Sequence, residues 1–415
     1  MRAADIAKGL ERFERRIAGS EAERRAANWL SDQLSSGGRE TRIETFWCRP
    51  NWALAQAWHL LVAIAGSLVA VHHPRIGGAL ILIALIAVIL DATLGISPGR
   101  RLTREHASQN IIAHAPTGQR SKRVRLIITA NYDAGRAGLV YRTPIRQLAA
   151  RGARLTRRIA PGWVGWLAIA LIWLLVVAIL RLEGSKGSIL GVAQVLPTVG
   201  LVLALALLVE LGTSDVGPGA GDNASGVAVA TVLALALDAA PPRNAAVEVV
   251  LQGGSDATAT GLRRYLKERK QNLNASNAVV LGIAASSGGD PRWWISDGQL
   301  VPLGYFARLR KLCANLASEE PDLRAGPHRG RGATPALPAR SARLPAIAIG
   351  SLDERGLSPR SHQKSDTAAD IDPAALDRVV EFGLLLVDAI DGFLRGAQPA
   401  TAVQARREPA SAGPS

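Results

Sequence analysis

Cysteine is scarce in this sequence: only Cys48 and Cys313 occur among 415 residues, and they lie far apart. Their number and spacing argue against a disulfide framework and against a cysteine-based zinc site. Aromatic residues make up only 4% of the chain although 48% of it is hydrophobic, so the apolar content is mostly Ala, Leu, Val and Ile. The first twenty residues, MRAADIAKGLERFERRIAGS, lack the apolar stretch of a signal peptide.

Acidic residues are also in deficit, with 34 Asp and Glu against 49 Lys and Arg and a net charge of +15. Nucleic acid is a common partner of so basic a chain. Here the arginines stand beside apolar runs and are not interleaved with aromatic residues. We therefore expect them to lie against the anionic headgroups of a lipid bilayer, and we expect no nucleic-acid partner.

Long apolar runs are what the sequence does contain. Four of them approach the roughly 20 residues that the core of a bilayer requires. Runs such as GWVGWLAIALIWLLVVAIL are apolar on every face, which favours membrane spans over buried core helices. The four predicted spans form two hairpins, and they cover residues 52–71, 76–96, 162–180 and 189–209.

Arginine near the span ends predicts the orientation of the chain. The flanks GRRLTR and RQLAARGARLTRRIA are rich in arginine, whereas the hairpin tips VHHPR and RLEGSKGS carry far less. The sequence therefore predicts a multi-pass protein of the cell membrane, with both termini and all long segments on the cytoplasmic side. Asp91 and Gln194 within the spans are candidates for a pore, but a conducting path usually has more polar residues.

The remaining segments predict one α/β domain, because apolar strand-like runs alternate with helical patterns. We expect strands at 124–133, 244–254, 277–285 and 344–351 in a mostly parallel central sheet, where ligands bind beyond the carboxyl ends of the strands. The domain would be assembled from 1–51, 97–161 and 212–395, interrupted by transmembrane hairpins at 52–96 and 162–211. Residues 396–415, rich in Ala, Pro and Arg, are predicted to be a disordered tail.

The stretch GPGAGDNASGVA places a single carboxylate, Asp222, between the last apolar run and a helical pattern. It resembles the segment of metallopeptidase family 28, the two-zinc aminopeptidases, that carries the metal-bridging aspartate. Four more segments follow the family's order: the N-terminal LERFERRIAGSEAERRAANWL, LIITANYDAG, VEVVLQGGSDATATGLRRYL and SHQKSDTAADIDPAAL. The resemblance implies a three-layer, zinc-exopeptidase-like fold with two inserted transmembrane helical hairpins.

Several of the family's functional positions are altered here. Asn131 stands where the family has a histidine ligand, and an amide is a weaker zinc ligand than imidazole. Asp133 is kept at the position that orients that histidine. Ser255 stands at the position of the general base, and a hydroxyl does not take a proton from metal-bound water near neutral pH. No carboxylate occurs between Val279 and Ser287, where the resemblance implies a further ligand.

Three ligand positions remain: Asp222, Asp256 in place of a glutamate, and His362. Two carboxylates and one imidazole form a set that can bind one zinc ion. The alternative is that no metal binds, that Asp222 and Asp256 cap the helices that follow them, and that His362 is a surface loop residue.

Three functions compete on this basis. The first is a membrane-anchored pseudoenzyme that binds a peptide, lipid or protein partner. The second is an active single-zinc metallopeptidase, and the third is a regulatory subunit of a membrane transport assembly. The Arg, Gly and Pro-rich segment 317–345 could form a lid or a lipid-facing arm, and its His328 is expected to be a solvated loop residue.

Overall fold

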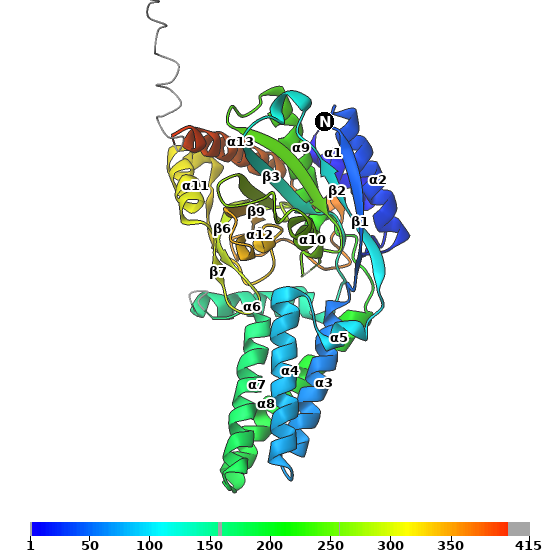
Figure 1. Ribbon diagram of the computed structural model, residues 1–415, viewed down its shortest axis with the longest axis vertical. Coiled ribbons are helices and arrows are strands. Elements are labelled where there is room, and N and C mark those ends of the chain that lie inside the picture. The colour runs from blue at the N-terminus through cyan, green and yellow to red at the C-terminus, as the bar shows by residue number, and fades with distance from the viewer. Residues whose placement is uncertain (1, 157–159, 257, 397–415) are drawn as a thin grey trace, which may run out of the picture.

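The computed structural model describes residues 2–156, 160–256 and 258–396. An α/β domain sits at one end of four long helices that form a bundle (Figure 1). The predicted tail, 396–415, lies outside the described residues except for Gly396, which ends the last helix.

One nine-stranded sheet forms the centre of the α/β domain. Along the main path the strands lie in the order β1-β2-β4-β3-β5-β9-β6-β7, and β8 pairs with β6. The strands are β1 (Thr41–Cys48), β2 (His106–Ala113), β3 (Val124–Asn131), β4 (Ala245–Gln252), β5 (Ala278–Ile283), β6 (Asp290–Asp297), β7 (Leu303–Gly304), β8 (Gly326–Arg329) and β9 (Ala346–Leu352).

The prediction of a mostly parallel sheet holds only for its centre. Strands β4, β3, β5 and β9 are parallel, whereas β1, β2, β6 and β7 each join the sheet antiparallel to a neighbour. The central strands are apolar on both faces, and all eight residues of β4 are buried, as expected for strands covered on both sides. The outer strands carry polar residues and lack this signal, so the sheet is mixed.

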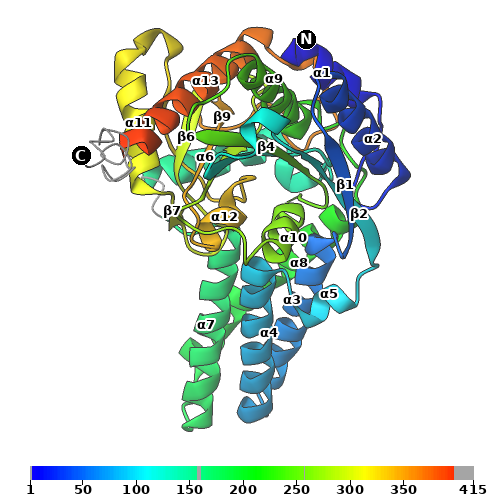
Figure 2. The same cartoon turned by 45° about the horizontal axis from the view of Figure 1, so that its top comes forward.

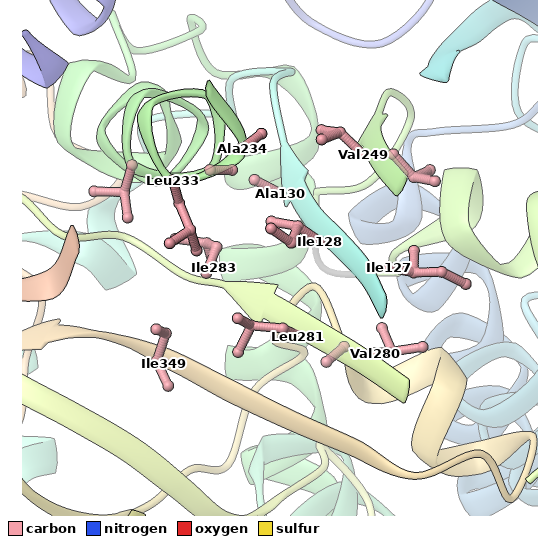
Figure 3. Packing of buried hydrophobic residues seen from close by; sticks show 14 of the residues in the cluster. Ile127, Ile128, Ala130, Leu233, Ala234, Val249, Val280, Leu281, Ile283 and Ile349 are labelled. Atoms are coloured by element: carbon pink, nitrogen blue, oxygen red, sulfur yellow. The ribbon is translucent and has the colours of Figure 1, made fainter. Parts of the chain in front are cut away.

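Helices pack on both faces of the sheet (Figure 2). On one face, Leu233 and Ala234 of α9 meet Ile128, Ala130 and Ile283 of the strands below (Figure 3). The helices of the α/β domain are α1 (Ala3–Glu11), α2 (Glu21–Ser36), α5 (Pro98–Arg101), α6 (Thr143–Leu155), α9 (Ser225–Ala239), α10 (Thr260–Glu268), α11 (Ala307–Glu319), α12 (Leu337–Ser341) and α13 (Pro373–Gly396).

The bundle consists of the predicted spans. Its helices are α3 (Trp52–Val69), α4 (Pro74–Leu94), α7 (Trp163–Leu182) and α8 (Ser188–Thr213). All four are long and apolar enough to cross a membrane. Residues 220–239 also meet that criterion, but they lie mostly buried in the α/β domain.

The outer surface of the bundle is apolar, which is unusual for a surface in contact with water. Large apolar side chains are exposed along all four helices; they include Leu61, Leu68, Leu82, Ile83, Ile86, Trp166, Ile169, Ile172, Trp173, Val176, Val195, Leu196 and Leu203.

The two candidate pore residues have partners inside the protein. Asp91 accepts hydrogen bonds from Arg100, Ser97 and Gln56, and the Arg100 Nε–Asp91 Oδ1 distance is 2.7 Å. Gln194 contacts Arg181 and Ser67. The Asp91–Arg100 ion pair therefore fastens the end of α4 to α5, at the junction of the bundle and the α/β domain.

Replacing Asp91 with alanine is expected to destabilise this junction. The guanidinium of Arg100 would stay buried without its carboxylate, and breaking a buried ion pair costs about 3–5 kcal/mol. Thermal unfolding of the purified protein, followed by tryptophan fluorescence, measures the loss. Arg24→Ala is the control, because the Arg24–Glu21 pair is exposed and contributes about 0–1 kcal/mol. Equal shifts in the two variants would contradict this account.

Candidate metal and ligand site

The carboxyl ends of β3 and β4 bring Asp133 and Asp256 together. Asp133 Oδ2 accepts hydrogen bonds from the backbone N–H groups of Ser255 and Asp256, at 2.8 and 3.0 Å. Asp133 is buried, and its position fixes the turn that follows β4. Through that turn Asp133 orients Asp256, whereas the resemblance gave it a histidine to orient.

Asp222 lies in the irregular turn Ala220–Ala224 before α9, where its own φ of −120° and ψ of 91° are not helical. Asp366 holds this turn, because its carboxylate accepts from the N–H groups of Gly221 and Asp222 at 2.7 and 3.0 Å. A Cβ at Gly221 would lie 2.5 Å from Asp366 Oδ1, so the close approach requires glycine. The hydroxyl of Ser361 donates to Asp222 Oδ2.

His362 lies between the two other candidate ligands. Its Nε2 is 3.5 Å from Asp222 Oδ2 and 3.7 Å from Asp256 Oδ1. Its Nδ1 is 3.2 Å from the backbone oxygen of Arg136, which fits donation from Nδ1–H and leaves Nε2 directed at the carboxylates. The ring stacks on Tyr141, with 4.3 Å between centroids and 16° between planes.

The helix-capping alternative is not what the structure shows. Neither α9 nor α10 has a side-chain cap hydrogen bond at its N-terminus, so Asp222 and Asp256 do not cap them. His362 is not a surface residue either, since only 17% of its side chain is exposed. Its φ of +58° is in the left-handed region, which costs a non-glycine residue of order 1–3 kcal/mol and is commoner at functional sites.

Buried charge shifts the pKa of several groups here. Burial would lower the pKa of His362, but the carboxylates of Asp256 and Asp222 outweigh it and raise that pKa. Burial and the nearby charge of Asp256 raise the pKa of Asp133 to about 7. Burial and Asp222 raise the pKa of Asp366 to about 6. Positive charge opposes these carboxylates, since Arg16 interacts with Asp133 and Asp366, Arg136 with Asp256, and Arg146 with Asp222.

A cavity of about 440 Å³ opens beside Asp256 and His362. The α/β domain contributes Asp133, Asp256 and His362 to its lining, and the bundle contributes residues of the first turn of α3 and of the end of α8. Trp52, the first residue of α3, donates its indole N–H to Asp256 Oδ2 at 3.3 Å. The bundle is therefore part of the site.

The three side chains suit a zinc ion in type, and the two distances from His362 to the carboxylates suit it in spacing. Two ligands of a tetrahedral zinc, each about 2.0–2.2 Å from it, lie about 3.4 Å apart, close to the two distances from His362 Nε2. A metal-ligating histidine usually donates its other N–H to an oxygen, as His362 does to Arg136. An assembled metal centre is not present: among the described residues no group of three or more His, Cys, Asp or Glu is placed to hold an ion.

The two altered family positions, Ser255 and Asn131, differ in their surroundings. The hydroxyl of Ser255 bonds within its own turn, to Gly253 O at 2.8 Å and Gln252 Oε1 at 3.1 Å, and is fully buried. Asn131 and Asp222 line a second cavity of about 240 Å³. Asn131 Oδ1 and Ser287 Oγ are buried with no hydrogen-bond partner in the described part of the chain.

His328, expected to be a solvated loop residue, also lines this second cavity. It stands on β8 against Trp294, with 5.2 Å between ring centroids. The segment 317–345 is thus part of the folded domain, since it contains β8 and α12.

Sequence reasoning missed four contributors to the site: Trp52, Tyr141, Ser361 and Asp366. Ser361 and Asp366 flank His362 within SHQKSDTAADIDPAAL, so their nearness in sequence was a signal. The sequence held no such signal for Trp52 and Tyr141. Trp52 reaches the site because α3 packs beside it, and Tyr141 because the turn Leu139–Tyr141 brings it there.

The family model of peptidase family M28 matches residues 209–387, which hold Asp222, Asp256 and His362. The resemblance to peptidase family M28 is confirmed. The altered position Asn131 and the retained Asp133 lie outside the matched range. No curated protein is significantly similar to the chain in sequence.

Solved structures show the same M28 peptidase-like fold. A glutaminyl cyclase of Bacteroides thetaiotaomicron bound to N-acetylhistamine is 13% identical, with a TM-score of 0.53 over 93% of this chain and 96% of that one. A leucine aminopeptidase precursor of the same organism is also 13% identical, with a TM-score of 0.52 over 93% and 95%. A glutaminyl cyclase of Fimbriiglobus ruber is 14% identical, with a TM-score of 0.52 over 94% of each chain. At such identities the likeness concerns the fold alone.

Glu23, which accepts a hydrogen bond from Gly254 beside the site, is expected to make the stability of the domain depend on pH. It is buried and accepts from Gly19 N, Ser108 Oγ and Gly254 N, and burial raises its pKa from an ordinary 4.5 to about 8. The folded chain therefore binds an extra proton between these values. The free energy of unfolding is expected to fall as pH rises from about 4.5 to 8, by up to about 1.4 kcal/mol per pH unit.

Urea titrations between pH 5 and 8 measure this dependence. In Glu23→Gln the free energy of unfolding should depend less steeply on pH, because up to one proton fewer is released on unfolding. Glu21→Gln is the control, because Glu21 lies exposed in the same helix and its pKa is lowered by Arg24. An unchanged slope in the Glu23 variant would show that another group carries the effect.

Proposed function

We propose that the chain is a membrane-anchored protein with an M28 peptidase-like fold that holds one zinc ion and binds a ligand without efficient hydrolysis. The observation that carries the proposal is the placement of His362 Nε2 within 3.5 and 3.7 Å of two carboxylates. The zinc would be held by Asp222, Asp256 and His362, and when bound it would polarise a carbonyl oxygen of the ligand.

The loss of turnover is supported by the position of Ser255. A general base must reach the proton that it removes. The Ser255 hydroxyl is buried and engaged with Gly253 and Gln252, and its own acidity is far from the useful range. Asn131 offers only a neutral amide where a second zinc would need a histidine.

Membrane anchoring is supported by the bundle. Its four helices are long enough to span a bilayer, and their exposed side chains are apolar. The arginine-rich flanks lie at the end of the bundle that carries the α/β domain, and this favours a domain on the cytoplasmic side.

The ligand is proposed to be a peptide or a peptide-like segment of a protein. A cavity of about 440 Å³ lined by carboxylates, an imidazole and apolar residues suits a short peptide. A pore-forming or transport role has less support, because Asp91 and Gln194 are engaged within the protein.

A second candidate is a single-zinc peptidase. It is favoured by one observation, that the Asp133 carboxylate lines the same cavity as Asp256 and His362 and offers an alternative base. An assay with aminoacyl amides in the presence of zinc separates the two. Turnover that is lost in His362→Ala would overturn the binding-only proposal.

Metal content is the first test of the proposal. The purified full chain, supplied with zinc and then dialysed, is expected to retain about one zinc per chain, and the Asp222→Ala, His362→Ala double variant to retain none. The matched control is Asp5→Ala, His72→Ala, which removes an exposed carboxylate and an exposed imidazole. Elemental analysis with no zinc in the parent would overturn both candidate functions.

Gly135 offers a test that keeps all three candidate ligand residues in the sequence. A Cβ at this position would lie 2.1 Å from His362 Cε1 and 2.3 Å from Nδ1, so Gly135→Ala must displace the ring. Zinc affinity is expected to fall by roughly 10–100-fold, as for the loss of a group that orients a ligand. A competition titration with a zinc chelator measures it. Gly118→Ala, which meets no atom within 4 Å, is expected to match the parent.

A further inference from the structure

Helix α6 turns its apolar side chains away from the protein. Ile145, Leu148 and Leu155 lie along one face, at helical spacing, and are 45%, 70% and 86% exposed. On the opposite face Ala150 is buried, Arg146 donates to Ser358 O at 2.6 Å and Arg154 donates to Glu354 O at 2.5 Å. An ordinary surface helix has the reverse arrangement, with the apolar stripe toward the core.

The place of α6 explains this reversal. It lies across the end of the bundle, between the bundle helices and the sheet (Figure 1). The bundle helix α7 begins at Trp163, shortly after α6 ends at Leu155. A helix so placed is at the level where a bilayer surrounding the bundle would end.

The charge of α6 matches that level. No Asp or Glu occurs between Asp133 and Glu183, so the segment that contains α6 is purely basic. Arg142 and Arg151 are exposed beside the apolar stripe. Basic and apolar side chains together are typical of helices that lie in the headgroup layer of a membrane.

Further exposed apolar residues flank α5, which also lies at the junction (Figure 1). Trp47, Leu94, Ile96 and Leu102 are 70%, 57%, 64% and 64% exposed. Tryptophan is enriched at this depth of a membrane, where its ring meets the headgroups. The apolar surface of the bundle therefore continues into the junction on the side of α5 as well.

We propose that α6 is an interfacial helix that lies in the plane of the membrane surface. Ile145, Leu148 and Leu155 enter the boundary between headgroups and acyl chains, and Arg142 and Arg151 bind lipid phosphates. The occupant of the apolar stripe is thus phospholipid. This inference rests on the proposed membrane anchoring and adds a second, peripheral contact with the bilayer.

Spin labels on the full chain in nanodiscs of phosphatidylcholine and phosphatidylglycerol test the proposal. Both native cysteines are buried, so labels go to introduced cysteines, and the parent chain gives the background. Leu148→Cys and Leu155→Cys probe α6. Ile83→Cys on the exposed face of α4 serves as the lipid reference, and Asp5→Cys near the N-terminus, at the opposite end of the molecule from the bundle, serves as the water reference (Figure 1).

The measured quantity is the ratio of accessibility to oxygen, which partitions into lipid, over accessibility to a water-soluble nickel complex. The ratios at 148 and 155 are expected to be several-fold above that at position 5 and below that at position 83. Values equal to position 5 would overturn the proposal, and so would low accessibility to both reagents, which means that protein covers the stripe. If position 83 is also water-accessible, the membrane anchoring itself fails.

Discussion

Everything at the functional end of this molecule depends on one electrostatic constraint: the imidazole of His362 lies against two carboxylates in a half-buried place. Two further carboxylates, Asp133 and Asp366, support the first two through backbone N–H groups and are themselves buried. So many acidic groups need positive charge among them, and Arg16, Arg136 and Arg146 supply it in addition to His362. The local backbone follows this need, since the turn of Asp222 and the left-handed conformation of His362 both serve to bring the side chains together.

The site belongs to two parts of the protein at once. Trp52 at the start of α3 donates to Asp256, and Tyr141, which precedes α6, stacks on His362. Gln363 bonds to Tyr141 O at 2.9 Å and so ties the loop of His362 to the same turn. The bundle therefore contributes to the site, because a shift of α3 or of the turn before α6 would move groups that touch the candidate ligands.

Sequence patterns predicted the parts that depend on local chemistry. Apolar runs located the four bundle helices within a few residues, and strands β3, β4, β5 and β9 were evident because both of their faces are buried. The trio of Asp222, Asp256 and His362 came from the family resemblance, and the structure brings the three together. The mixed sheet was not predictable, because strands such as β6, with the sequence DPRWWISD, carry charges and no alternation. Asp366 was missed although it lies close to His362 in sequence, because the backbone N–H groups that it holds belong to a distant segment of the chain.

The order of the strands has a consequence for how the chain is made. β1 pairs with β2 across the whole of the first helical hairpin, from Thr41 opposite Ala113 to Cys48 opposite His106. β4 lies between β2 and β3 in the sheet but follows both hairpins in the chain. During synthesis β2 and β3 must therefore wait with open edges until β4 emerges, and such edges favour wrong pairing. Because β4 is synthesised after all four bundle helices, Asp133 and Asp256 can come together only once those helices have been made.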